Sequence, residues 1–347
     1  ANEDIIKING TFYDYNWEPD GDDLVIGAAA DDSYDWAVGG GNLRLQGFLA
    51  GADDSIAYLE VDLGVNNEWY SPGGGNARIY LNNTGSGADQ GNYQEAIFGT
   101  SGNDVMTGGG GALDNIFGFG GNDTISVSSG TSGNLIGGDG EDSITGGDQW
   151  DVLRGGAGDD TLNGGDGIDS VRYHSQAGSP DPFLHGAFVN LSGATMTFDF
   201  NGAPDVTVQA GQAIDNWGDI DTIINVENVR GSNLDDVIVG TTGENVLQGL
   251  NGDDVISGSG GNDYLIGGGG LDSFVFNFVE TGDTIIEDFI VGTDALSLNG
   301  GLLIGGLSEI DSDEDMVVDS TVVTLNNGIT ITLTDVLGVA DSNDLFA

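Results

Sequence analysis

One large apolar residue recurs every nine positions through the middle of the chain, with small or polar residues around it. Residues 137–172 read GGDGEDSIT, GGDQWDVLR, GGAGDDTLN and GGDGIDSVR, so Ile144, Leu153, Leu162 and Val171 share one register. Side chains alternate across a strand, so a three-residue strand with one central apolar side chain buries that side chain alone. The pattern predicts coils of a flattened helix, each with two short parallel strands and two turns.

This register extends over two blocks, residues 99–172 and 231–275. The step from Asp104 to Asp114 is ten residues rather than nine. The stretch from Val127 to Ile136 lacks the Asp that recurs in the other units, so its turn differs from theirs in chemistry. Eight units match the full pattern and about four are degenerate. The apolar residues expected to point inward are Met106, Ile116, Ile125, Ile144, Leu153, Leu162, Val171, Ile238, Leu247, Ile256, Leu265 and Phe274.

The segments outside the two blocks also predict β-structure. Residues 1–75 are rich in aromatic residues and alternate polar and apolar positions between Gly and Asp clusters, which predicts a small antiparallel β domain. Residues 76–98 are expected to lead by strands into the first roll, 173–230 to form a β-rich insert, and 276–347 to form a C-terminal β cap. The predicted fold is therefore all-β: two parallel β-rolls flanked by an N-terminal β domain, an insert and a cap.

The turns between these strands have the chemistry of a calcium site. Glycine in the first, second and fourth places permits positive backbone dihedrals and lets carbonyl oxygens converge, and Asp in the sixth place adds a carboxylate. Ca²⁺ takes about six to eight such hard oxygen ligands in loose geometry, whereas Mg²⁺ needs a stricter octahedron. The residues in the ligand place, which together predict roughly ten calcium ions, are Asp104, Asp114, Asp123, Asp142, Asp151, Asp160, Asp169, Asp236, Asn245, Asp254, Asp263 and Asp272.

Composition supports the same chemistry and excludes some partners. Six Lys and Arg stand against 57 acidic residues, of which 45 are Asp and 12 Glu, and the net charge is −51. This excess of Asp over Glu indicates turn chemistry, and repulsion of this size opposes a compact state unless cations are built in. Nucleic acid and anionic lipid are not expected as partners, because little basic surface exists to meet phosphate.

The rolls are expected to fold only where calcium is plentiful. Each coil buries a single file of apolar side chains, while every ordered residue costs conformational entropy. Calcium binding to the folded state alone adds stability by linkage. The sequence has no cysteine, no run of eighteen apolar residues and no basic-plus-apolar signal segment, so no membrane insertion is expected.

The nonapeptide G-G-x-G-x-D-x-U-x, with U a large apolar residue, resembles the repeat of the RTX family of calcium-binding proteins. Residues 282–298, GDTIIEDFIVGTDALSL, resemble the segment that closes many RTX rolls, and the end of the chain is similar to their uncleaved type I secretion signal. Leu-Phe-Ala closes the chain where several apolar residues after an acid are typical. The resemblance covers residues 90–347 and implies a bacterial protein exported unfolded, which folds at the cell surface or outside the cell on meeting calcium.

Catalytic motifs are missing from the sequence. Both histidines, His174 and His185, lie in the predicted insert, and the single lysine is Lys7. The sequence has no H-E-x-x-H, no G-x-S-x-G and no cysteine nucleophile. Tyr173 and His174 beside Arg172 suggest the base of a polysaccharide lyase, but a loop histidine is more often a polar filler. We expect no enzymatic activity.

A second acidic pattern occurs near the C-terminus. Asp311, Asp313 and Asp315 alternate as at the start of an EF-hand loop, but Met316 stands where that loop needs glycine and no Glu closes it. An acidic, solvated turn is the preferred interpretation.

Three functions fit these observations. The first is a secreted structural protein that calcium folds and that self-assembles into a filament, surface layer or matrix. The second is a calcium-stabilised adhesin that contacts a glycan or cell surface through residues 1–75, and the third is the non-catalytic repeat half of a secreted enzyme. We favour the first, as a homopolymer. Because six cations cannot supply many salt bridges, its contacts are expected to involve aromatic residues such as Phe12, Tyr13, Tyr15 and Trp17.

Overall fold

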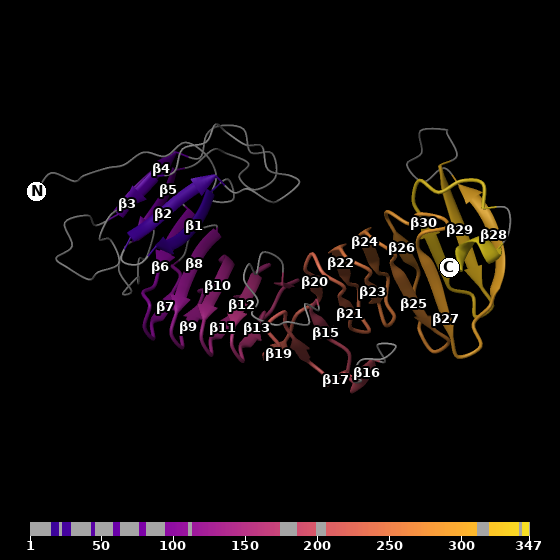
Figure 1. The fold of residues 1–347 in the computed structure, drawn as a ribbon, viewed down its shortest axis with the longest axis horizontal. Helices are drawn as coiled ribbons and strands as arrows, with labels where there is room; N and C mark the ends of the chain where they lie inside the picture. The colour runs from indigo at the N-terminus through magenta and orange to yellow at the C-terminus, as the bar shows by residue number, and fades with distance from the viewer. Residues whose placement is uncertain are drawn as a thin grey trace, which may run out of the picture. The chain divides into compact units, whose positions relative to one another are not determined.

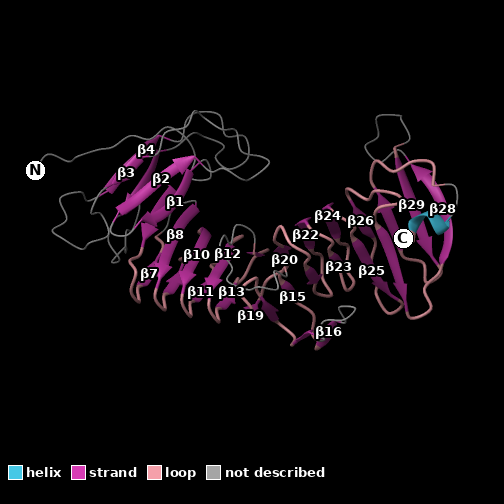
Figure 2. Ribbon diagram, in the orientation of Figure 1, coloured by secondary structure: helices cyan, strands magenta, loops and turns pink. Residues whose placement is uncertain are grey.

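The computed structural model describes residues 15–20, 23–28, 43–45, 58–62, 76–80, 94–109, 113–173, 186–198, 206–310, 319–339 and 342–346. The chain divides into two compact units, Ala1–Asp151 and Val152–Ala347, and each is described by itself. Apart from one short 3₁₀ helix, η2 (Ser342–Leu345), the regular structure of the described residues consists of strands (Figures 1 and 2). The all-β prediction is confirmed. No helix among the described residues is long and apolar enough to span a membrane.

The first unit contains a parallel roll of two facing sheets. Strands β6 (Gln94–Phe98), β8 (Leu113–Gly120) and β10 (Ser132–Asp139) form one sheet, and β7 (Val105–Thr107), β9 (Thr124–Ser126) and β11 (Ser143–Thr145) form the other. In the first sheet Ile116 pairs with Leu135, and in the second Ile125 pairs with Ile144. The inward apolar residues therefore stack in register, coil upon coil.

Further strands precede this roll. Strand β5 (Asn76–Tyr80) pairs in parallel with β6, and β4 (Tyr58–Asp62) pairs antiparallel with β5. A separate antiparallel sheet is formed by β1 (Tyr15–Asp20), β2 (Asp23–Ala28) and β3 (Leu43–Leu45). The chain enters the roll by adding strands to one edge of its first sheet.

The second unit has the same architecture, with more coils. Its first sheet contains β12 (Val152–Ala157), β14 (Ser170–Arg172), β20 (Asn228–Arg230), β22 (Val246–Asn251), β24 (Tyr264–Gly269) and β26 (Thr284–Ile286). Its second sheet contains β13 (Thr161–Asn163), β19 (Ile220–Ile224), β18 (Gln212–Ile214), β15 (Phe188–Asn190), β21 (Val237–Val239), β23 (Val255–Ser257), β25 (Ser273–Asn277) and β27 (Ala295–Asn299). Strand β18 pairs antiparallel with both of its neighbours.

The predicted single-file core is confirmed. All twelve apolar residues expected to point inward have no solvent-exposed surface. Leu135, which occupies the inward place in the stretch without an Asp, is equally buried. The row therefore continues through that coil although its turn chemistry differs.

Part of the predicted insert belongs to the roll. Leu162 on β13 pairs with Ile223 on β19, and Val171 on β14 pairs with Val229 on β20. Between these coils the chain forms β15, β18 and a hairpin of β16 (Met196–Phe198) and β17 (Val206–Val208). Phe188 packs in a small core of its own with Val208 and Val237.

An antiparallel cap follows the second roll. Strands β28 (Ile304–Ile310), β29 (Ser320–Leu325) and β30 (Thr330–Leu333) pair antiparallel in sequence, and β30 also pairs in parallel with β26 at the edge of the roll. Within the cap itself, Val323 on β29 and Ile331 and Leu333 on β30 are fully buried. The cap thus covers a sheet edge that would otherwise expose unpaired backbone groups.

Candidate metal centre

All twelve residues predicted in the ligand place are buried, each with at most 4% of its surface exposed. Eleven of them directly precede a strand and Asp114 is the second residue of β8, so within each unit they lie where a turn meets a strand. Carboxylates are rarely buried without a partner. Each buried carboxylate oxygen therefore needs a hydrogen-bond donor or a cation.

The first carboxylate oxygen links successive coils. Oδ1 of Asp123 accepts a hydrogen bond of 2.8 Å from the backbone N–H of Asp104, and Oδ1 of Asp142 accepts one of 2.7 Å from that of Asp123. The second unit repeats this geometry: Oδ1 of Asp272 accepts from Asp254 N–H at 3.0 Å, as does Oδ1 of Asp254 from Asp236 N–H at 2.8 Å. Each carboxylate is thus oriented by the backbone of the preceding coil.

The second carboxylate oxygen lies where a cation would fit. Among the described residues, Oδ2 of Asp123, Asp254 and Asp272 is buried and has no hydrogen-bond donor. In each case Oδ2 fills the space that a Cβ would need on the glycine five residues earlier, as at Gly249 before Asp254. The carbonyl oxygen of Gly267 lies 2.7 Å from that same Cβ position.

This arrangement, called here the glycine cradle, consists of a glycine and the Asp Oδ2 atom that occupies the space of its missing Cβ, as at Gly249 and Asp254. It explains why the turns need residues without a side chain. At Gly118 and Gly249 a carboxylate oxygen and a carbonyl oxygen from the next coil converge, and among the described residues that carboxylate oxygen has no hydrogen-bond donor. Two acceptors held together in a dry site repel each other unless a cation lies between them. The residues present therefore fit Ca²⁺, which would be held by Asp Oδ2 and backbone carbonyls.

Burial also perturbs the ionisation of these groups. Desolvation raises the pKa of Asp254 to about 8 and that of Asp123 to about 7, and it does the same for Asp236 and Asp263, each to about 7. Neighbouring carboxylates such as Asp236 and Asp272 raise the pKa of Asp254 further. Near neutral pH a large fraction of these carboxyls is therefore protonated unless a cation stabilises their charge.

The structure adds acidic residues that the nonapeptide pattern missed. Oδ1 of Asp221 accepts from the backbone N–H of Asp160 at 3.1 Å, and Oε2 of Glu227 accepts from that of Asp169 at 2.8 Å. Both continue the rows through the predicted insert. Each stands two places before an inward residue, Ile223 or Val229, but the chain excursion breaks the nine-residue spacing that made the other ligands recognisable.

The closing segment supplies two more carboxylates at the end of the second roll. Oδ1 of Asp294 accepts from the backbone N–H of Asp272 at 3.2 Å. The two oxygens of Asp288 accept from the N–H groups of Gly267 and Gly268 at 2.9 and 2.7 Å. Asp294 stands two places before the apolar residue Leu296, as the ligand residue does in each repeat, but both lie beyond the second predicted block, residues 231–275.

Two positions depart from the acidic pattern. Gly133 pairs with Asp114 and so occupies the ligand place of the coil that lacks an Asp. Asn245 satisfies its amide internally: its Oδ1 accepts from Thr241 N–H at 2.9 Å, and its Nδ2 donates to the carbonyl oxygen of Glu227 at 2.6 Å. Because the amide directs a donor at a carbonyl, we expect Asn245 to be a poorer calcium ligand than Asp.

Backbone oxygens must supply most of any coordination sphere here. No three His, Cys, Asp or Glu side chains converge as a metal-binding group in the part of the chain that the structure describes. This is the expected consequence of one carboxylate per turn. The candidate groups considered for catalysis and for an EF-hand, His174, His185, Asp311, Asp313 and Asp315, lie outside the described residues.

A family model supports this assignment of the repeats. The model of the RTX calcium-binding nonapeptide repeat (4 copies) matches residues 89–112, 98–133, 129–162, 136–171, 230–265 and 239–274. These matches lie within residues 89–171 and 230–274, and so nearly coincide with the two predicted blocks, 99–172 and 231–275. Comparison with curated proteins gives no match.

Among solved structures, the chain is similar to the extracellular lipase LipA from Serratia marcescens. The sequence identity is 18% and the TM-score 0.26, and the similarity covers 73% of this chain and 40% of that chain. The chain thus spans less than half of the lipase. The repeat matches, together with the stacked coils and their buried aspartates, identify the chain as a protein with RTX calcium-binding nonapeptide repeats, which form its parallel β-rolls.

Proposed function

We propose that the chain is a secreted structural protein that folds on external calcium and then self-assembles into an extracellular filament, surface layer or matrix. The observation that carries the calcium step is the set of buried Oδ2 atoms facing carbonyl oxygens over glycine. Without a cation these acceptors oppose folding, and with one they hold successive coils together. Calcium modules outside cells bind with dissociation constants of about 10⁻⁴ to 10⁻³ M, which suits a protein that stays unfolded until it is exported by type I secretion.

A structural role without catalysis is part of this proposal. The sequence has no recognisable nucleophile, zinc motif or base with a partner, and its abundant chemistry is calcium ligation. A carboxylate pair is uninformative as a glycosidase signal in a chain with 57 acids. The repeats would instead provide a rod of stacked coils whose stiffness depends on bound calcium.

Self-assembly would use surfaces other than salt bridges between copies. Six basic residues cannot pair with many acids, so contacts are proposed to come from aromatic side chains of the N-terminal segment, strand edges or shared calcium. Phe12, Tyr13, Tyr15 and Trp17 are the proposed anchor. A heterologous contact from this anchor to another copy would propagate into a filament or lattice.

The test compares the full chain with a variant lacking residues 1–20. In calcium of about 10 mM, roughly tenfold above the weakest affinity expected for such modules, light scattering and electron microscopy should show polymers of the full chain. The shortened variant should show the same calcium-induced β signal but remain monomeric. A full chain that stays monomeric at high concentration contradicts assembly, and the adhesin function then becomes the better account.

A further inference from the structure

Four aspartates of the second unit form one row, in which hydrogen bonds link each residue to the next coil. They are Asp236, Asp254, Asp272 and Asp294, which directly precede β21, β23, β25 and β27 and have at most 3% of their surface exposed. Oδ1 is satisfied in the same way in all four, because it accepts a backbone N–H of the preceding coil. That N–H belongs to Ala187 for the first aspartate and to the preceding aspartate for the other three. Any difference between the four turns therefore lies at Oδ2.

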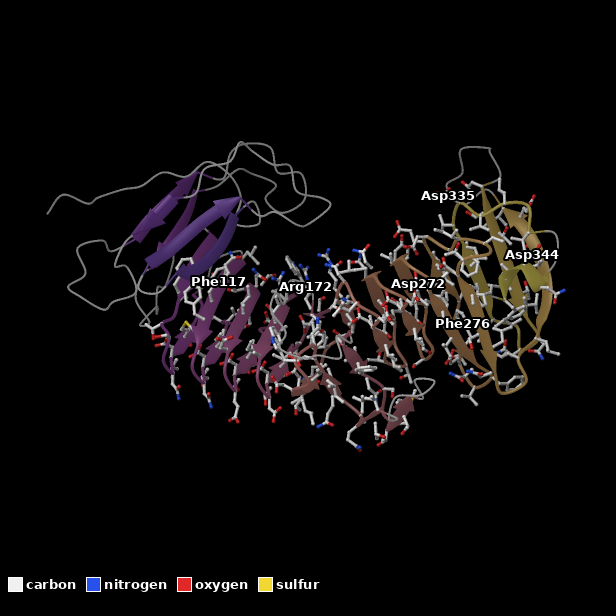
Figure 3. All side chains as sticks on the ribbon, in the orientation of Figure 1. Phe117, Arg172, Asp272, Phe276, Asp335 and Asp344 are labelled. Carbon is white, nitrogen blue, oxygen red and sulfur yellow. The ribbon has the colours of Figure 1, made fainter. Side chains whose placement is uncertain are left out.

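Oδ2 has no donor at the two interior turns of this row. In Asp254 and Asp272 this oxygen is buried and has no hydrogen-bond donor among the described residues. In both it fills the Cβ space of the glycine five residues earlier, Gly249 or Gly267, and Figure 3 labels Asp272. The interior turns thus keep a glycine cradle and a carboxylate oxygen that a cation can bind.

The two end turns satisfy Oδ2 from their own backbone. Oδ2 of Asp236 accepts from the N–H of Ser232 at 2.6 Å, and the hydroxyl of Ser232 donates to Oδ1 at 2.8 Å. Oδ2 of Asp294 accepts from the N–H of Ile290 at 2.7 Å. Phe289 stands five residues before Asp294, where the other three turns have glycine, so this turn has no glycine cradle.

The backbone conformation four places before the Asp distinguishes the two kinds of turn. Leu250 and Gly268, in the interior turns, have φ values of 92° and 102°, and the N–H of Gly268 donates instead to Oδ2 of Asp288 at 2.7 Å. The described residues with positive φ do not include Ser232 and Ile290, in the end turns. A left-handed backbone is unfavourable for a β-branched residue such as Ile, and the hydroxyl of Ser adds a donor to the closed turn.

A cation adds little where a buried carboxylate already has its donors. Removing a carboxylate from water costs free energy, which hydrogen bonds or a cation can offset, and three donors do so at Asp236. We propose that calcium binds in this row only at the interior turns, one ion at Asp254 and one at Asp272. The end turns at Asp236 and Asp294 close on the protein's own donors and take no metal. This assignment rests on the proposed calcium-dependent folding and specifies which turns of the row carry it.

A crystal of the unaltered full chain grown in calcium tests the assignment directly. Anomalous difference density should show one ion within about 2.3 to 2.6 Å of Oδ2 of Asp254 and another at the same distance from Oδ2 of Asp272. Neither oxygen of Asp236 or Asp294 should have an ion at that distance. An ion bound to Asp236 or Asp294, or no ion at Asp254 or Asp272, overturns the assignment.

Four matched Asp-to-Asn variants of the full chain test it in solution. Calorimetry should count one calcium ion fewer for Asp254→Asn and for Asp272→Asn than for the unaltered chain. Asp236→Asn and Asp294→Asn should bind the same number of ions as the unaltered chain. They should need more calcium to reach the folded circular dichroism signal, because hydrogen bonds to a charged group are lost from the folded state. The loss of one ion in all four variants would show that the end turns also hold calcium.

The outcomes separate this assignment from the proposed function. The crystal uses the unaltered chain, so it decides the assignment even where a variant does not fold. A full chain that binds calcium at the interior turns but stays monomeric by light scattering supports the assignment and contradicts the polymer. A polymer with calcium at the end turns overturns the assignment alone, and a full chain that folds without binding calcium overturns the assignment and the calcium step of the proposed function.

Discussion

Asn245→Asp should change the sign of its effect on stability according to whether calcium is present. In the protein, Nδ2 of Asn245 donates to the carbonyl oxygen of Glu227 at 2.6 Å, while Oδ1 lies over Gly240, where the carbonyl oxygen of Gly258 is 2.8 Å from the Cβ position. Aspartate removes the donor and places two carboxylate oxygens among these carbonyls. The variant thus supplies the carboxylate that a calcium site needs and, in calcium-free solution, leaves one buried carboxylate oxygen facing the carbonyl oxygen of Glu227 without a donor.

The magnitudes follow from linkage and desolvation. One added site, occupied at about 100 times its dissociation constant, stabilises the folded state by about 2.7 kcal/mol. For a unit of this size that corresponds to a rise in melting temperature of about 5 to 10 °C. In chelator the lost hydrogen bond and the unsatisfied group cost about 1 to 3 kcal/mol. Asp254→Asn, the matched opposite exchange on the other row, should lose one ion and be less stable in calcium.

The assay is thermal unfolding followed by circular dichroism, in about 10 mM calcium and in excess chelator, and calorimetry counts the bound calcium ions. A calcium concentration of about 10 mM is about 100 times the tighter dissociation constant of extracellular calcium modules. The variant should bind one more ion than the unaltered chain. If Asn245→Asp lowers the melting temperature in both solutions, or binds no additional calcium, the assignment of this row as ligands is wrong.

The other predictions concern the same rolls. In chelator the β signal of residues 99–172 and 231–275 should be lost near pH 8 and partly return on acidification. Burial raises the pKa of Asp254 to about 8 and of Asp123 to about 7, so their contribution to calcium-free stability is complete below about pH 3.9 and is lost as pH rises through these values. Millimolar magnesium should restore little of the signal, and a calcium-free protein that is folded at pH 8 but not at pH 5 would contradict this prediction. Leu162→Asp buries a charge in the apolar file and should abolish folding of its roll even in excess calcium, whereas Thr161→Asp on the exposed face should be tolerated, as circular dichroism will report. Leu250→Gly should raise the melting temperature in calcium, because Leu250 has a φ of 92°, a left-handed conformation that costs a residue with a side chain about 1 to 2 kcal/mol; an unchanged or lower value would contradict it.

The strictly periodic parts of the fold were predictable from the sequence, for a physical reason. With one side chain per coil pointing inward, a nine-residue repeat determines both the turn chemistry and the buried position, so Met106 and Phe274 could be placed without a structure. The inserted excursion hid Asp221 and Glu227, since 61 and 58 residues separate them from their hydrogen-bond partners Asp160 and Asp169. Tertiary stacking, not local spacing, brings them into the rows.

Register between distant strands was equally inaccessible. Arg172 and Arg230 each appear in the sequence as an isolated base, and only the pairing of β14 with β20 makes them neighbours. The lack of charge on Asn245 predicts a weaker ligand, which stays a prediction. The hydrogen bond from its amide to Glu227, which determines the geometry, depends on a coil contributed by the excursion.

The direction of the hydrogen bonds between ligand residues gives the second roll a preferred order of assembly. The backbone N–H of Asp236 is satisfied by the carboxylate of Asp254, that of Asp254 by Asp272, and that of Asp272 by Asp294. Every coil therefore depends on the coil that follows it in the chain, and the final acceptors come from the closing segment. Ordering should start at this C-terminal end and propagate coil by coil toward the N-terminus, because a coil formed without its successor leaves a buried donor unsatisfied. Loss of the C-terminal coil removes the template for the remaining coils of this roll, whereas loss of its N-terminal coil only shortens the roll.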